Sequence, residues 1–61
     1  MSKILVKSPG MNKSKALGAD GKLTTRTIYT VMFKTKEYAD EIAAELTEDN
    51  PGWTFKVVKF Q

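Results

Sequence analysis

The chain contains no cysteine and no histidine. Without cysteine, disulfides, thiol nucleophiles and thiolate metal sites are all excluded. Without histidine, the usual general base near neutral pH is missing, so Ser2, Ser8 and Ser14 have no imidazole to activate them. We therefore expect a protein that is not an enzyme and that carries no cofactor and no metal ion.

Two motifs come close to ligand-binding patterns without matching them. The segment from Gly18 to Lys22 has the glycines and the lysine of a phosphate-binding loop, but Ala16 stands where the first glycine belongs and Leu23 replaces the hydroxyl residue. The carboxylates after residue 36 radiate from one predicted helix, whereas Ca²⁺ and Mg²⁺ require oxygen ligands that converge. We interpret the first motif as a glycine-rich turn and the second as a solvated helix surface.

Long hydrophobic runs are also missing. No stretch approaches the roughly 20 apolar residues of a membrane span. The apolar stretch nearest the N-terminus, residues 4–6, is too short for the core of a signal peptide. A cytoplasmic protein without a membrane partner is expected, and 61 residues predict one domain over residues 1–61.

Charge is strongly segregated along the chain, although the net charge is only +3. Residues 1–34 carry seven basic side chains and one acidic side chain. Residues 35–50 carry six acidic side chains and one basic side chain, and the last eleven residues add two lysines. The sequence therefore predicts an acidic segment inside a basic frame.

The order of elements predicts an α+β fold with the sequence β-β-α-β. Residues 3–7, 23–33 and 53–60 have the β-branched and aromatic composition of strands, and residues 36–48 have the spacing of an amphipathic helix. Two strands of one sheet that are joined by a helix usually run parallel, so the third strand should run parallel to the second. We predict a three-stranded, mainly antiparallel sheet in the order 2-1-3 with the helix on one face; an edge position for the first strand is the alternative.

Local signals set the ends of the predicted helix. Thr35 occupies the N-cap position, and Asn50-Pro51-Gly52 has the signature of a type II turn that closes the helix. Residues 9–22 contain three lysines and three glycines, and we predict a long exposed basic loop there, with a brief helical turn at 12–17.

Alternation along the strands divides their side chains between two faces. The larger apolar set should lie under Ala39, Ile42, Ala43 and Leu46 of the helix; it consists of Ile4, Val6, Tyr29, Val31, Phe33, Phe55 and Val57. The opposite face should carry an apolar patch with basic neighbours, formed by Leu5, Arg26, Ile28, Met32, Val58 and Phe60. This patch is either an interaction surface, or covered by the long loop, or ordinary exposed surface.

These surfaces lead to two hypotheses of function. The first is a protein-binding module that uses the patch, or an acidic ridge formed by Glu37, Glu41, Glu45 and Glu48. The second is a nucleic-acid-binding protein whose phosphate contacts come from Lys13, Lys15 and Lys22 on the loop and from the basic side chains near the sheet. Homodimerisation through the second sheet face or an edge strand is compatible with both.

The segment Phe33-Lys34-Thr35-Lys36-Glu37-Tyr38-Ala39-Asp40, leading through Leu46 to Asn50-Pro51-Gly52-Trp53, resembles the strand–helix–turn of many small, uncharacterised bacteriophage proteins. The resemblance covers about half of the chain. It implies an accessory role, such as modulation of a host protein, and assigns no site residues.

Overall fold

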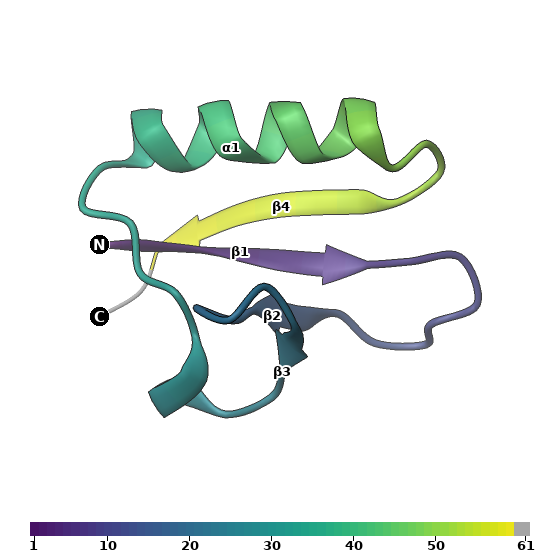
Figure 1. Ribbon diagram of the computed structural model, residues 1–61, viewed down its shortest axis with the longest axis horizontal. Coiled ribbons are helices and arrows are strands. Elements are labelled where there is room, and N and C mark those ends of the chain that lie inside the picture. The colour runs from purple at the N-terminus through teal and green to yellow at the C-terminus, as the bar shows by residue number, and fades with distance from the viewer. Residues whose placement is uncertain (60–61) are drawn as a thin grey trace.

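One helix packs on a four-stranded antiparallel sheet in the computed structural model, which describes residues 1–59 (Figure 1). The α+β class is confirmed, with four strands where the sequence predicted three. The elements in chain order are β1 (Ser2–Lys7), β2 (Lys15–Leu17), β3 (Leu23–Thr24), the 3-10 turn η1 (Thr27–Tyr29), α1 (Lys36–Asp49) and β4 (Thr54–Lys59).

Strand β1 lies inside the sheet, whose order is β3-β2-β1-β4. It pairs along its whole length with β4, from Ser2 opposite Lys59 to Lys7 opposite Thr54. On its other side it pairs with β2 at Leu5 and Val6 only. The internal position that the sequence favoured for the first strand is therefore correct.

The strand predicted over residues 23–33 is wrong for most of its length. Only Leu23 and Thr24 lie in β3, after which the chain turns through η1 and returns to the sheet as single bridges at Thr30 and Phe33. Threonine hydroxyls explain the break: the Arg26 amide donates to Thr24 Oγ1 (3.0 Å), and the Thr30 hydroxyl donates to the Arg26 carbonyl (2.9 Å). Such local bonds compete with a sheet ladder, although threonine and isoleucine favour strands by composition.

The predicted parallel return is wrong for β3, because three antiparallel pairings separate β3 from β4 and each of them reverses the chain. The predicted parallel orientation is found only at Phe33, the last residue of the predicted second strand. The bridge from Phe33 to Ser2 is antiparallel, so the chain there runs in the same direction as β4, with β1 between them.

The predicted loop over residues 9–22 contains a strand instead of a helical turn. Ala16 of β2 is buried and pairs with Leu5 of β1, while the neighbouring lysines stay exposed. This strand has only three residues, a small alanine between a lysine and a leucine. Its hydrophobic pattern is too weak to predict a strand from the sequence.

The core lies between the sheet and α1. Ile4 and Val6 are 0% and 1% exposed, and burial of each contributes about 1.5–3 kcal/mol. Ala39 and Ala43 are the buried residues of α1, and their small side chains allow the helix to approach β4 and β1 closely. The predicted core is confirmed except at two positions: Tyr29 is 56% exposed, and Leu46 lines a surface groove outside the core cluster. Partly buried side chains complete the core: Leu17, Leu23, Val31, Ile42, Trp53, Phe55 and Val57.

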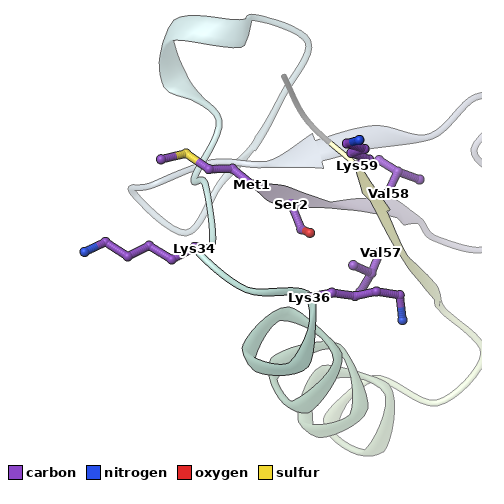
Figure 2. Close-up of a pocket in the computed structure, with 7 residues that line it drawn as sticks. All are labelled: Met1, Ser2, Lys34, Lys36, Val57, Val58 and Lys59. Atoms are coloured by element: carbon purple, nitrogen blue, oxygen red, sulfur yellow. The ribbon is translucent and has the colours of Figure 1, made fainter.

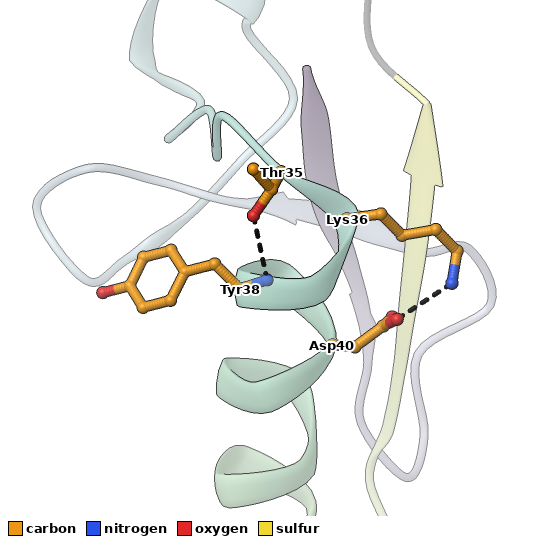
Figure 3. A network of polar contacts seen from close by, with 4 residues as sticks. All are labelled: Thr35, Lys36, Tyr38 and Asp40. Atoms are coloured by element: carbon orange, nitrogen blue, oxygen red, sulfur yellow. Dashed lines mark hydrogen bonds and ion pairs between the residues drawn. The ribbon is translucent and has the colours of Figure 1, made fainter.

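Both ends of α1 follow the sequence signals. The Thr35 hydroxyl accepts a hydrogen bond from the Tyr38 amide (3.2 Å), as Figure 3 shows. At the other end the Trp53 amide donates to the Asn50 carbonyl, and Gly52 adopts the positive φ of 88° that the turn requires. Among residues 1–59 no helix has the length and apolar character needed to cross a membrane.

Replacing the cap tests how much the helix depends on it. We expect Thr35→Ala to lower the free energy of unfolding by about 1 kcal/mol, because the Tyr38 amide then loses its acceptor. Thr35→Ser, which keeps the hydroxyl, is the matched control and should stay near the wild type. Urea unfolding followed by circular dichroism measures both, and equal stability of the alanine and serine variants would contradict the capping role.

Candidate functional site

Three large, exposed apolar side chains cluster in one short segment, residues 26–32, which we call the apolar turn. Ile28 is 78% exposed, Tyr29 is 56% exposed and Met32 is 49% exposed. In Figure 1 the segment protrudes from the sheet on the side away from α1. Large apolar groups held in water in this way are typical of an interaction site.

Hydrogen bonds hold the apolar turn in one conformation. Within it, the Tyr29 amide donates to the Arg26 carbonyl (3.2 Å) and the Thr30 amide donates to the Thr27 carbonyl (3.1 Å). Two further bonds tie it to the β2–β3 hairpin: the Ala19 amide donates to the Tyr29 carbonyl (2.9 Å), and the Val31 amide donates to the Leu17 carbonyl (3.0 Å). The exposed side chains are therefore presented on a fixed backbone.

Gly18 is the position where the hairpin and the apolar turn come closest. Its amide donates to the Lys22 carbonyl (2.8 Å), and its carbonyl accepts from the Gly21 amide (3.0 Å). A Cβ atom at this position would lie 2.6 Å from the Lys22 carbonyl oxygen and 3.2 Å from the Tyr29 carbonyl oxygen. The glycine that resembled part of a phosphate loop is required here for close backbone packing.

The predicted patch on the sheet face opposite the helix is divided by the structure. Leu5 and Val58 do lie on that face, and both are half-buried. Arg26, Ile28 and Met32 belong to the apolar turn instead, because residues 25–29 leave the sheet. Phe60 lies outside the described residues. The sequence thus identified Ile28 and Met32 as exposed apolar residues but assigned them, together with Arg26, to the wrong surface.

The sheet face opposite the helix is rich in lysine. Lys3 pairs with Val58, Leu5 with Lys56, and Lys7 with Thr54, and paired residues share a face. We call this surface the lysine face. It carries Lys3, Lys7 and Lys56 around the side chains of Leu5 and Val58, with Ala16 beside them on β2.

The acidic ridge is present on α1. Glu37, Glu41, Glu45 and Glu48 are all exposed, and no basic residue lies in the last turn of the helix. The ion pair recorded among residues 1–59 is Lys36 with Asp40 (2.8 Å, Figure 3). The hydrogen bond to Asp40 and its negative charge raise the pKa of Lys36 above its ordinary value of 10.5.

Hollows lie at different places on the surface of residues 1–59. One, of about 330 Å³, lies beside the start of α1, and Figure 2 shows that the side chains of Lys34, Lys36 and Lys59 diverge there and form no common anion site. A second, of about 210 Å³, lies on the lysine face. A third, of about 410 Å³, is a mostly apolar groove that Leu17, Leu23, Leu46, Trp53 and Phe55 line, with Lys22 and Asn50 among its polar residues.

The three loop lysines predicted to contact nucleic acid do not form one surface. Lys15 lines the hollow on the lysine face, whereas Lys22 lines the groove beside Trp53. Lys13 is exposed in the segment between β1 and β2. Lys15 pairs with Val6, so its side chain leaves the sheet on the helix side, opposite to the lysines of β1 and β4 that define the lysine face.

Comparisons with protein-family models, curated proteins and solved structures find no match to this chain. The resemblance to small bacteriophage proteins stays a prediction. In residues 1–59 no three acidic side chains come together in a way that could hold a metal ion.

Gly18→Ala tests the packing of the apolar turn against the hairpin. We expect a loss of about 1–3 kcal/mol in the free energy of unfolding, because the added methyl group overlaps the Lys22 carbonyl. Amide hydrogen exchange should also accelerate at Ala19 and Val31, whose bonds cross to the turn. Unchanged stability and unchanged exchange would contradict this account.

Glu48→Lys tests the charge at the end of α1. We expect it to raise the free energy of unfolding by about 0.5–1 kcal/mol at low salt, because a cation complements the helix dipole and can pair with Glu45. Glu48→Gln should give a smaller gain, and high salt should reduce both. Urea titrations at two ionic strengths measure these effects, and a gain that salt leaves intact would contradict an electrostatic cause.

Proposed function

We propose that this protein is a non-catalytic, protein-binding module that contacts its partner through the apolar turn. The observation that carries the proposal is the exposure of Ile28, Tyr29 and Met32 on one braced segment. The proposal keeps the cytoplasmic location expected from the sequence. The further proposal that the protein modulates a host protein rests only on the resemblance to bacteriophage proteins.

The hydrogen bonds of the apolar turn support binding in energetic terms. Ordering a flexible loop on association costs free energy, and a segment that is already fixed avoids most of this cost. Full burial of Ile28 in a partner would contribute about 1.5–3 kcal/mol. Tyr29 and Arg26 are of the residue types that most often dominate interface energies.

The lysine face is a poorer candidate for the same role. The cores of protein interfaces are depleted in lysine, yet Lys56 pairs with Leu5 in the middle of this face. A homodimer formed by two copies of the face would bring lysines of both copies together, and such pairs repel. The same proposal therefore favours a monomer, or an assembly through another surface.

Site-specific crosslinking tests the proposed partner site. A photoreactive phenylalanine analogue placed at position 28 should form a discrete protein adduct in the cells where the protein occurs. The same analogue at position 38 is the matched control, because Tyr38 is 54% exposed and belongs to α1, where its ring packs against Phe33 and not against the residues of the apolar turn that the proposal uses. No adduct at position 28, or the same adduct from both positions, would contradict the proposal.

A serine pair separates binding from folding. Ile28→Ser should abolish the adduct formed from an analogue at position 29, whereas Tyr38→Ser should leave it intact. Ile28→Ser should also change the free energy of unfolding by no more than about 0.5 kcal/mol, because the side chain is exposed. A much larger loss would show that the isoleucine is buried in an assembly of this chain.

A further inference from the structure

We propose that the lysine face binds the phosphate backbone of nucleic acid, at a site that adjoins the apolar turn through Thr27 and Thr30. The proposal does not depend on the protein-binding role. It rests on the placement of cations and hydroxyl groups on one side of the sheet and of carboxylates on the other.

The register between β1 and β4 fixes the arrangement of the cations. Lys56 pairs with Leu5, so it lies diagonally between Lys3 and Lys7 on the same face. Diagonal neighbours of this kind are separated by about 7–8 Å, and the two lysines of β1 by about 14 Å. The result is a row of three cations along the strands, which suits a linear chain of negative charges.

The hollow on the lysine face adds hydrogen-bond donors beside these cations. Hydroxyl residues surround it, which are Ser14, Thr24, Thr25, Thr27 and Thr30. Lys15 also borders it, but Lys15 pairs with Val6, so its side chain leaves the sheet on the helix side. Thr24 and Thr30 already bond to Arg26, but the hydroxyls of Ser14, Thr25 and Thr27 have no partner among residues 1–59. Hydroxyl and ammonium groups are the donors that proteins commonly offer to phosphate oxygens.

The acidic side chains are placed so that they do not oppose such a ligand. Six of the seven lie at positions 37–49 on α1, which packs on the other face of the sheet. The seventh, Asp20, lies in the turn between β2 and β3, where its carboxylate accepts a bond from the Lys22 amide (3.0 Å). No described carboxylate lines the hollow or belongs to the strand residues of the lysine face.

The composition of the face favours phosphate over an acidic protein. Protein interfaces require a well-packed apolar core, whereas here Leu5, Ala16 and Val58 are buried or half-buried already. No described aromatic ring lies on the strand residues of this face, so these residues offer bases no ring to stack on. Binding should therefore follow charge and salt and not base sequence.

Fluorescence anisotropy with labelled oligothymidylate tests the site on the full chain. We expect binding at about 50 mM salt that weakens about twenty-fold at about 200 mM salt, the change that three neutralised phosphates predict for a single strand. An anisotropy that does not change on addition of protein at the lower salt would overturn the proposal.

Two double variants with the same net charge locate the site. Lys7→Gln with Lys56→Gln removes two cations from the lysine face, and affinity should fall at least ten-fold. Lys22→Gln with Lys34→Gln removes two cations from elsewhere, and affinity should fall less than three-fold. Equal losses in the two variants would show attraction to net charge alone and would overturn the assignment.

Polyglutamate distinguishes phosphate from other polyanions. At equal charge concentration it should fail to displace the oligothymidylate if the face is specific for a phosphate backbone. Displacement at equal charge concentration would overturn the nucleic-acid assignment in favour of an acidic protein. A circular dichroism spectrum that matches the wild type excludes misfolding in each variant.

Discussion

The pairing of β1 with β4 is the interaction on which the rest of the structure depends. It aligns six residues of each strand and places Ile4 and Val6 in the fully buried centre of the molecule. A chain of 61 residues without disulfides has little other apolar area to bury, so its stability depends on the packing around this central strand. The helix covers it from one face, and β2 and Phe33 complete its second edge.

Hydroxyl groups then decide where the sheet stops. The bonds that Thr24 and Thr30 make to Arg26 turn the chain out of the sheet, so a segment with strand composition becomes a protruding turn. This diversion exposes Ile28 and Tyr29, which would otherwise have had a place on the sheet. These hydrogen bonds are therefore the reason why the prediction from composition was wrong, and they also form the candidate partner site.

The segregation of charge along the chain places acidic and basic side chains in different layers of the fold. The acidic helix lies on one face of the sheet, and the lysines of β1 and β4 that point away from it lie on the other. Neighbouring carboxylates along α1 repel one another and destabilise the helix slightly, while the charge on the opposite face remains positive. A small domain can in this way present an apolar turn and a basic face to different kinds of partner.

The sequence by itself determined the helix from Thr35 to the turn at Gly52, the α+β class and most of the core, because these depend on local capping and periodicity. It favoured the internal place of the first strand, and strand pairing decided it. It also identified Ile28 and Met32 as unusual apolar residues and the glutamates of α1 as exposed. Only the tertiary structure decided which surface each residue joined. Side-chain hydroxyls ended the second strand, and pairing with β1 recruited Ala16 from a segment with no strand signal. Contacts between residues distant in sequence set both outcomes, and periodicity within one segment carries no information about them.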